Sequence, residues 1–423
     1  MCKLPIRAVI VGGGHRSDIY AELALKNPKK LQIVGLVDPS KKRTDYLKNK
    51  YNIPRQNCFS SVEALCEREK LGELIINGTM DQLHVPTAIP TLKKGYDLLL
   101  EKPLSVSKEE MDLLCAAAKE YGRKVHLCHV LRYTAFYSTV KKLICDGEIG
   151  RPISLSMSEH VAYAHMGVSF VRGKWRSKST CFAPMLLAKS CHDLDIMTWL
   201  MKPYRPEAVS SFGSNLQFTK ENKPKDAKHR CYDGCPHIDS CPYSAKSNYV
   251  EHDFWDIYAF GAAEGQTISE EEKVQSLRTD NPFGICAWDF DREDNVDHQT
   301  VNVSFEGGAT ATFSLVGGAS RAQRSLHLIG TTGEIIGVFE DNRIVLRKIS
   351  PHKKNWFDEQ TIDVDAPTEG HAGGDLALIE DFVDILSGGT PDHRTCDLNS
   401  AADAYRIAFA AEVAMKEKRT VIL

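Results

Sequence analysis

The chain has 423 residues, of which 42% are hydrophobic and 26% are charged, and its formal net charge is −3. One hydrophobic core rarely serves a chain of this length, so two domains are expected. The slight negative charge excludes a protein built mainly to bind nucleic acid or an anionic membrane, and no apolar run is long enough to cross a bilayer.

The start of the chain and its cysteines indicate where the protein works. The first strand pattern begins at Ile6, which leaves no room for a signal peptide after Met1. Most of the 13 cysteines stand singly within apolar patterns, as Cys66 and Cys128 do. That distribution is typical of reduced thiols, so we expect a cytoplasmic protein.

Strand and helix patterns alternate through the first third of the chain. The β-branched runs 6–11 and 31–38 enclose a helical pattern, and the same order repeats as far as a last strand pattern within 124–133. In the helical pattern 84–95, Pro90 is expected to bend the helix or divide it in two. This alternation predicts a doubly wound parallel sheet that binds its ligand beyond the carboxyl ends of the strands.

The turn after the first strand predicts the class of ligand. Gly12 and Gly14 follow the strand, Ser17 fills the third small position, and a helical pattern begins there. Glycines let the backbone turn tightly and approach a pyrophosphate, which then meets the free N–H groups of the helix N-terminus. A glycine cluster alone is a weak signal, but its place between a strand and a helix favours a dinucleotide site over a plain turn.

Asp38, at the end of the second strand pattern, predicts which dinucleotide binds. A carboxylate there accepts hydrogen bonds from the adenosine ribose hydroxyls and repels a 2′-phosphate, so NAD(H) is favoured over NADP(H). Lys41, Lys42 and Arg43 follow directly. They weaken the preference, because their charges could balance a phosphate.

The stretch "LLLEKP" carries a buried strand pattern straight into an acid and a lysine. A buried charge is costly unless it is paired or used, so Glu101 and Lys102 either emerge into solvent or line a site. Lys102 suits proton transfer, because partial burial beside a cationic nicotinamide ring favours neutral lysine. The alternative is a lysine whose stem packs on the protein while its ammonium stays in water.

These residues together resemble the glucose–fructose oxidoreductase, inositol dehydrogenase and rhizopine-catabolism (Gfo/Idh/MocA) family. Its marks are an N-terminal glycine turn, a Glu-Lys-Pro after the fifth strand, here 101–103, and a later helix with a catalytic histidine. The resemblance covers essentially the whole chain. It implies an α/β protein with a Rossmann dinucleotide-binding domain at 1–130. An α+β domain at 131–423 would follow, with an open, mostly antiparallel sheet for substrate binding and oligomer contacts.

The resemblance also implies the cofactor contacts, and a Lys102–Pro103 peptide bond that can be cis. The residues assigned to cofactor binding are Gly12, Gly14, His15, Arg16, Asp38, Arg43, Thr79, His84, Glu101 and Lys102.

A helical pattern at 186–200 matches the catalytic helix of the family when His192 is aligned with its histidine. Family members usually carry an Asp four residues earlier, one turn away on the same face. This chain has Ala188 there, and Lys189 stands beside it. The resemblance therefore implies a proton relay of Lys102 and His192, in which Lys189 binds a substrate oxygen or replaces the missing carboxylate.

Three residues are assigned to the substrate: Arg172, Trp175 and Asp193. The stretch "FVRGKWR" combines a ring for stacking with forked donors, although a solvated basic loop with one anchoring Trp is an equal alternative. In "EGHAGGD", His371 either lies at the rim of the pocket or belongs to a glycine turn in which Asp375 caps a helix.

Cys231, Cys235 and Cys241 stand close together in a polar insertion, about 219–295, in the second domain. Three thiols and a nearby histidine could hold zinc tetrahedrally. The spacing matches none of the common paired zinc motifs, and the fourth ligand is ambiguous. Free thiols are therefore the favoured interpretation, and no metal ligand is assigned to the active site.

We expect an NAD(P)-dependent oxidoreductase that transfers hydride between a nicotinamide and a secondary hydroxyl of a sugar, sugar derivative, glycoside or polyol. The resemblance leaves two alternatives: NAD-dependent glycoside cleavage through a transient keto sugar, without net redox change, and a dinucleotide-binding sugar sensor. Lys102 and His192 argue against a sensor, which needs no proton relay. The expected partners are a sugar-like small molecule and copies of the same chain, joined as a homodimer or homotetramer through the C-terminal sheet.

Overall fold

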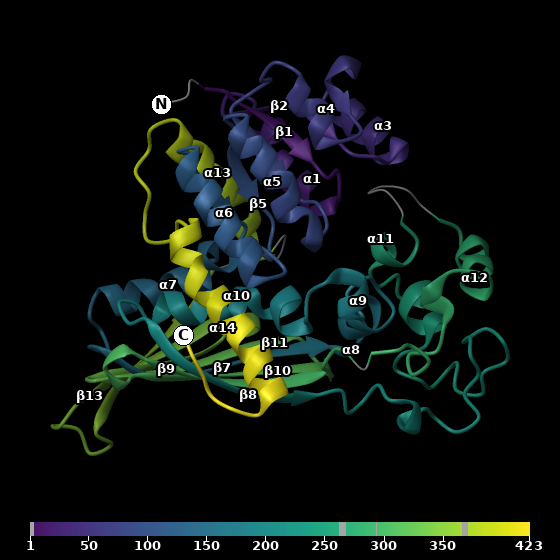
Figure 1. The fold of residues 1–423 in the computed structure, drawn as a ribbon. Coiled ribbons are helices and arrows are strands. Elements are labelled where there is room, and N and C mark those ends of the chain that lie inside the picture. Colours follow the sequence, from purple (N-terminus) through teal and green to yellow (C-terminus); the bar gives the residue numbers. More distant parts are fainter. Residues whose placement is uncertain (1–3, 262–267, 293, 366–370) are drawn as a thin grey trace.

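Two sheets organise the computed structural model, which describes residues 4–261, 268–292, 294–365 and 371–423 (Figure 1). The first is a six-stranded parallel sheet in the order β3-β2-β1-β4-β5-β6. The second has nine strands in the order β14-β13-β12-β11-β7-β10-β9-β8-β15, antiparallel throughout except for the β7–β10 pair. The fold class predicted from the sequence is confirmed.

The parallel sheet forms because its strands are apolar on both faces and helices cover both. Its strand order reverses between β1 and β4, and in such sheets the crevice at that point binds the ligand. The elements are β1 (Ile6–Val11), α1 (His15–Ala21), α2 (Leu23–Lys26), β2 (Leu31–Val37), α3 (Lys41–Lys50), β3 (Cys58–Phe59), α4 (Val62–Glu67), β4 (Leu74–Asn77), α5 (His84–Lys93), β5 (Asp97–Leu100), α6 (Lys108–Glu120) and β6 (Val125–Leu127).

Helix α5 differs from the expectation at Pro90. It runs as one helix from His84 to Lys93 with Pro90 inside it. Proline there removes one backbone hydrogen bond, the one that the carbonyl four residues earlier would accept. The apolar face of the helix, which includes Val85 and Leu92, is buried in the core and compensates for that loss.

The second sheet packs against the long helix α10 (Met185–Leu200) on one face. Its elements, with the helices around it, are α7 (Ala135–Cys145), β7 (Pro152–Ala162), α8 (Tyr163–His165), α9 (Lys178–Cys181), α10 (Met185–Leu200), β8 (Pro206–Ser214), α11 (Asp256–Ala259), α12 (Glu270–Arg278), β9 (His298–Phe305), β10 (Thr310–Ala319), β11 (Gln323–Gly330), β12 (Gly333–Val338), β13 (Arg343–Ile349), β14 (Phe357–Asp363), α13 (Gly374–Leu386), α14 (Leu398–Glu417) and β15 (Val421–Ile422).

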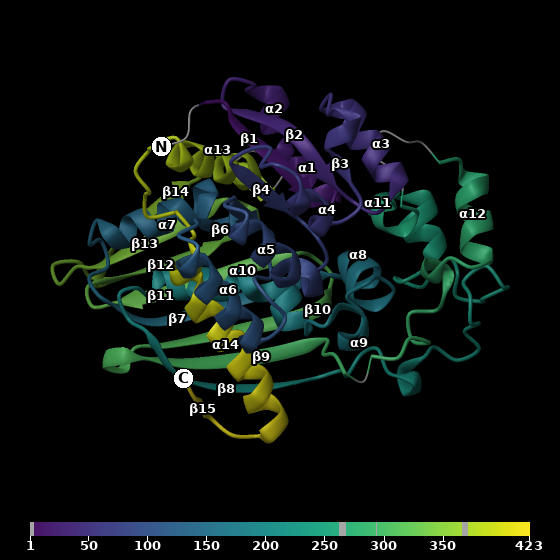
Figure 2. The same cartoon turned by 45° about the horizontal axis from the view of Figure 1, so that its top comes forward.

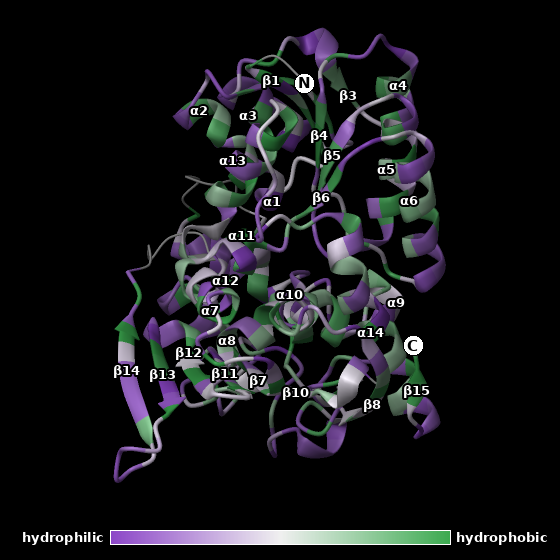
Figure 3. Ribbon diagram, turned by 90° about the vertical axis from the view of Figure 1, so that its left-hand side faces the viewer, coloured by the Kyte–Doolittle hydropathy of each residue, from purple (hydrophilic) through white to green (hydrophobic). Residues whose placement is uncertain are grey.

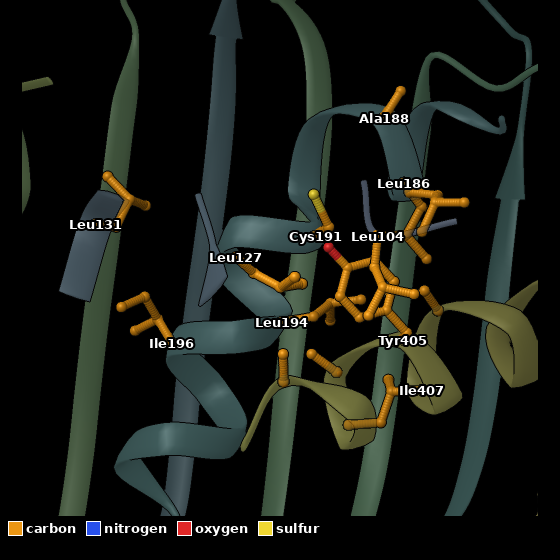
Figure 4. Close-up of a cluster of buried hydrophobic side chains, with 14 of the residues drawn as sticks. Leu104, Leu127, Leu131, Leu186, Ala188, Cys191, Leu194, Ile196, Tyr405 and Ile407 are labelled. Carbon is orange, nitrogen blue, oxygen red and sulfur yellow. The ribbon is translucent and has the colours of Figure 1, made fainter. Parts of the chain in front are cut away.

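Helix α10 is buried almost all round, because it lies between the second sheet, α14 and the Rossmann domain. Figure 4 shows side chains from the Rossmann domain, α10 and α14 meeting in one apolar cluster: Leu104 and Leu127 of the Rossmann domain, Leu194 of α10 and Tyr405 of α14. A helix buried on every side fixes the residues it carries, so α10 is a rigid support for a site.

An ion pair lies within this buried region. Nε and Nη2 of Arg132, which follows β6, contact the two carboxylate oxygens of Asp195 on α10 at 2.7 and 2.6 Å, and both side chains are about 1% exposed. The same guanidinium donates to the carbonyl of Thr395 at 3.2 Å. The pair therefore joins the end of the Rossmann sheet to α10 and to the chain before α14.

Helix α13 returns to the Rossmann domain, although it follows the second sheet in the chain. Its apolar residues, among them Leu378 and Phe382, share a core with Ile6, Ile10 and Leu36 of β1 and β2. It therefore covers part of the face of the parallel sheet on which α1 and α2 also pack.

The segment between β8 and β9 forms a separate lobe beside the second sheet (Figures 1 and 2). Its own buried cluster is small and includes Cys231, Tyr249, Leu277 and Phe283. In both views α11, at one end of this lobe, lies toward α3 of the Rossmann domain. The lobe thus reaches toward the Rossmann domain.

The hydropathy of the strands follows their position in the two sheets. In Figure 3 the parallel strands β4 and β5 are hydrophobic, whereas β13 and β14 at the edge of the second sheet are largely hydrophilic. Among the helices in the described ranges, none combines the length and the apolar character that spanning a bilayer requires.

The buried pair gives a stability prediction. Arg132→Met should lower the free energy of unfolding by about 3–5 kcal/mol, because Asp195 then remains buried without its cation. Arg132→Met/Asp195→Leu should recover much of that loss, since no charge is left behind. Urea unfolding followed by circular dichroism measures both. A loss below about 1 kcal/mol in the single variant would show that the pair is dispensable.

Candidate active site

The glycine turn packs against the loop that follows β4. Gly12 has φ +81°, and a Cβ built on it would lie 2.8 Å from the backbone N and Cα of Thr79, so only glycine fits. Gly14 is the N-cap of α1, and a Cβ there would meet only one atom, at 3.9 Å. The turn is therefore closed on the strand side and open at the start of α1, where a pyrophosphate would need room.

Asp38 is buried at the end of β2, and its carboxylate has four donors. The backbone N–H groups of Gly13 and Ser40 donate to it at 2.8 and 2.7 Å. Arg43 donates twice, from Nε and Nη2, at 3.0 Å each. Asp38, which is predicted to bind the ribose, is thus already paired with Arg43, which could balance the charge of a 2′-phosphate. Arg43 is half exposed, so it can leave this pair.

Glu101 ends β5 as a buried carboxylate with partners on three sides. Arg16 Nε donates to Oε1 at 2.7 Å, the Tyr20 hydroxyl donates to Oε1 at 2.9 Å, and the Lys102 backbone N–H donates to Oε2 at 2.8 Å. Burial raises the pKa of Glu101, but the charges of Arg16 and Lys102 outweigh it and lower the pKa below the ordinary value. The carboxylate is ionised and fixed.

Arg16 extends this cluster to α13. Its Nη2 donates to Asp375 Oδ1 at 2.6 Å and also contacts the Tyr20 hydroxyl. Asp375 lies in the first turn of α13, and the N-cap is Gly373, so the expected capping role of Asp375 is wrong. The side chain of His371 and residues 366–370 lie outside the described part of the chain. His15 is exposed at the start of α1.

Lys102 bridges the two domains. Its peptide bond to Pro103 is cis, and its Nζ donates to the Ala188 carbonyl of α10 at 2.9 Å. His84 supports this loop from behind: its ring nitrogens lie 2.6 Å from the Pro103 carbonyl oxygen and 3.1 Å from that of Thr79. The predicted cofactor residues Thr79 and His84 thus hold the Glu-Lys-Pro segment in position.

His192 lies one turn beyond Ala188 on α10 and is 7% exposed. Its ring meets that of His129 edge-on, with centroids 5.4 Å apart, and Nε2 of His129 lies 3.0 Å from the Tyr405 hydroxyl. Burial lowers the pKa of His129 to about 4. His129 is therefore neutral near pH 7 and adds no charge beside His192.

Lys189 and Asp193 belong to a buried charge network at the sheet side of α10. Lys189 Nζ lies 3.1 Å from Glu159 Oε1, and Nε of Arg324 lies 2.7 Å from Glu159 Oε2 and 2.9 Å from Asp193 Oδ1. Burial, reinforced by Glu159, raises the pKa of Asp193 to about 7, although Arg324 opposes it. Burial also lowers the pKa of Lys189. The network ties α10 to β7 and β11.

The two "FVRGKWR" residues predicted to bind substrate point in different directions. Trp175 Nε1 donates to the buried carboxylate of Asp81 at 3.0 Å, which joins this loop to the Rossmann domain at the cleft. Arg172 is buried in the lobe between β8 and β9, where it donates to the carbonyls of Ile285 and Tyr243 at 2.8 and 2.6 Å. Arg172 therefore lies inside the lobe and not where a substrate ligand was expected.

The structure adds an aromatic wall that the sequence did not predict. The ring of Tyr258 from α11 lies 6.2 Å from that of Trp175, and Trp255 stacks on His165 at 4.6 Å. Lys102 is among the charges that act on the Tyr258 hydroxyl. Nothing in the spacing of "FWDIYAF" indicates that the insertion returns to the cleft, so only its aromatic content could have drawn attention.

Within the described residues, one group of three possible metal ligands has its ligand atoms within 4.8 Å of one another: His129, Asp195 and Cys396. Arg132 already holds both carboxylate oxygens of Asp195. A guanidinium beside the carboxylate repels a cation, so this group is part of the core and not a metal centre.

Both domains of the chain match a known protein family. Residues 6–129 match the Gfo/Idh/MocA oxidoreductase family with its NAD-binding Rossmann fold, and residues 141–423 match the C-terminal α/β domain of the same family. YteT of Bacillus subtilis (strain 168) is 25% identical over 389 residues, which cover 89% of this chain and 87% of YteT.

Two further proteins similar to this chain are dehydrogenases. Inositol 2-dehydrogenase of Salmonella typhimurium (strain LT2) is 22% identical over 199 residues, 47% of this chain and 55% of that protein. The WlbA dehydrogenase of Bordetella pertussis, solved with NADH and UDP-GlcNAcA, has a TM-score of 0.67 at 14% identity over 100% of this chain and 99% of WlbA. That structural likeness shows the fold alone.

The dinucleotide turn, the Glu-Lys-Pro at the end of β5 and the two matched domains lead to one conclusion. This chain belongs to the Gfo/Idh/MocA family of NAD(P)-dependent oxidoreductases.

Proposed function

We propose that this protein is an NAD(H)-preferring oxidoreductase that acts on a secondary hydroxyl of a sugar, sugar derivative, glycoside or polyol. The contact between Lys102 Nζ and the Ala188 carbonyl carries the proposal, because it holds the lysine one helical turn from His192 at the mouth of the dinucleotide crevice. When bound, a nicotinamide dinucleotide supplies the acceptor or donor of hydride.

The residues of the chain handle the proton. In the oxidation direction Lys102 accepts the proton of the substrate hydroxyl, and His192 passes it on; in reduction both steps reverse. Glu101 stays ionised through its contacts with Arg16 and Tyr20 and keeps Lys102 in place through the backbone. Ala188 contributes its carbonyl oxygen where other family members are expected to use a carboxylate.

We propose that Lys189 and Asp193 position α10. Lys189 pairs with Glu159, and Asp193 pairs with Arg324, at the sheet side of the helix. A raised KM with unaltered kcat in Lys189→Met would instead make Lys189 a substrate ligand. Trp175 and the aromatic wall of Tyr258 and Trp255 offer faces on which the apolar side of a sugar ring can stack.

We also propose a cytoplasmic homodimer or homotetramer that forms through the open face of the nine-stranded sheet. Phe212 of β8 and Ile329 of β11 are exposed there, and apolar side chains that gather on one exposed face mark an interaction surface. Light scattering coupled to size exclusion measures the state; a monomer at every concentration would contradict the proposal.

The substrate class is tested by incubating the protein with NAD and a panel of sugars, polyols and glycosides. NADH absorbance and sugar release are followed separately. Growth of NADH absorbance supports the dehydrogenase. Sugar release without NADH would indicate redox-neutral glycoside cleavage, and binding of a sugar without either signal would indicate a sensor.

The proton relay gives the second prediction. Lys102→Met should keep the fold and dinucleotide binding while cutting turnover by about 10²–10⁴, the usual effect of losing a general base. His192→Asn should cause a loss of similar scale, and the double variant should fall well short of the product, because members of one relay are non-additive.

Steady-state kinetics on a verified substrate measures these losses, with Lys108→Met on the exposed surface of α6 as the matched control. A turnover within a few-fold of wild type for Lys102→Met would end the catalytic assignment.

The cofactor preference gives the third prediction. NAD(H) should bind more tightly than NADP(H) by about 1–3 kcal/mol, because the Asp38 carboxylate and a 2′-phosphate repel each other. Asp38→Ser should remove most of that difference, and Arg43→Ala should leave it in place. Calorimetric titration of NADH and NADPH into the wild type and both variants measures these differences. Equal or tighter NADPH binding by the wild type, lost in Arg43→Ala, would assign Arg43 to the phosphate.

A further inference from the structure

Four cysteines from distant parts of the insertion converge on one cavity. Cys231, Cys235 and Cys241 come from its first half, and Cys286 comes from the stretch between α12 and β9. All four line a cavity of about 20 Å³, which holds a single small ion or water molecule. Sequence spacing identified three thiols and left the fourth ligand open; the fold supplies a fourth cysteine.

Backbone pairing brings the two ends together. Arg230 and Ile285 form an isolated antiparallel bridge, and on either side of it Cys231 N–H donates to the Gly284 carbonyl at 3.0 Å and Cys286 N–H donates to the His229 carbonyl at 2.8 Å. Cys231 and Cys286 are thus diagonal neighbours on the same face of this ribbon, where Cα atoms lie about 7–8 Å apart. Side chains at that separation can share one ion.

The charge of Arg172 is the second, independent observation. This arginine is 1% exposed, and its guanidinium donates to two carbonyls and to the Tyr249 hydroxyl. Within the described part of the chain, no carboxylate forms an ion pair with it, and it lines the same cavity as the four cysteines. A buried cation needs a negative partner, which thiolates at this cavity supply.

Backbone N–H groups point at the sulfur atoms. The Ala245 N–H donates to Cys231 Sγ at 3.4 Å. Backbone hydrogen bonds from Tyr243 and Trp288 reach Cys241 and Cys286. Backbone N–H groups aimed at sulfur compensate the charge that a metal-bound thiolate retains.

The histidines of the insertion are engaged elsewhere. His237 lines the cavity, but its Nε2 lies 2.7 Å from the Lys225 carbonyl oxygen. His229 Nδ1 lies 3.0 Å from Asp289 Oδ2. Among the described residues no three of the four sulfur atoms all lie within 4.8 Å of one another, so an ion would draw them together by side-chain rotation.

We propose that Cys231, Cys235, Cys241 and Cys286 form a structural tetrathiolate zinc site that ties the two ends of the insertion together. Four thiolates with closed coordination are typical of structural zinc, which contributes folding energy directly. The lobe needs such a link, because its own buried cluster is small. Arg172 offsets part of the net negative charge of the site.

This site would also order one side of the catalytic cleft. The same lobe carries Trp255 and Tyr258 to the vicinity of Trp175. Loss of the metal should therefore loosen the aromatic wall and raise KM for the substrate. Dinucleotide binding should persist, because Gly12, Gly14 and Asp38 belong to the Rossmann domain.

The test uses the full chain purified under reducing conditions without chelators. Elemental analysis should find stoichiometric zinc, and Co²⁺ exchanged for it should give the visible absorption bands of tetrahedral thiolate coordination. Cys286→Ser should weaken zinc retention against a competing chelator by more than the roughly 10–100-fold that loss of an outer partner costs. NAD titration of the same variant checks that the Rossmann domain is folded.

Two matched variants sharpen the assignment. Cys145→Ser removes an exposed thiol of α7 and should leave the metal content unchanged. His237→Gln should also retain zinc; loss of metal there, with retention in Cys286→Ser, would overturn the four-cysteine site. So would wild-type protein that holds no zinc and takes up no Co²⁺, iron in place of zinc, or disulfides among these cysteines under the purification conditions.

Discussion

The ionised carboxylate of Glu101 is the constraint on which the cleft depends. It is buried at the end of β5, so it needs partners, and it takes them from two parts of the chain: Arg16 and Tyr20 of α1, and the backbone of Lys102. Arg16 also holds Asp375 of α13. A single buried charge thereby sets the cofactor turn, the proposed base and the returning helix relative to one another. Removing the carboxylate would leave Asp375 as the one remaining carboxylate that compensates the arginine in the described part of the chain, and the loss of a partner is the costly case for a buried pair.

Helix α10 fixes the other side of the cleft by a different means. It is held by apolar contacts on nearly all sides and by the network of Glu159, Lys189 and Arg324 at the sheet. With alanine at position 188, the helix offers Lys102 a carbonyl oxygen, which cannot titrate. His129, whose ring meets that of His192, is neutral over the working range and adds no charge beside the proposed relay.

The sequence predicted the features that depend on local rules. Gly12, Asp38 and Glu101 all stand at the ends of buried strand patterns, and parallel strands bring their carboxyl ends to one edge. Features set by long-range packing were not predictable. The direction of Arg172 depends on a lobe that closes only when residues near Cys286 pair with those near Cys231. The amphipathic pattern of α13 predicted a helix but could not say which sheet it covers.

The return of α13 has a consequence for the order in which the molecule is made. A face of the Rossmann sheet, with Ile6, Ile10 and Leu36, is covered by residues such as Leu378 and Phe382. During synthesis the N-terminal domain emerges first, but the part of this face that α13 covers stays bare until residues 374–386 have been made. The nascent Rossmann domain therefore exposes apolar surface through most of translation, until α13 packs against it.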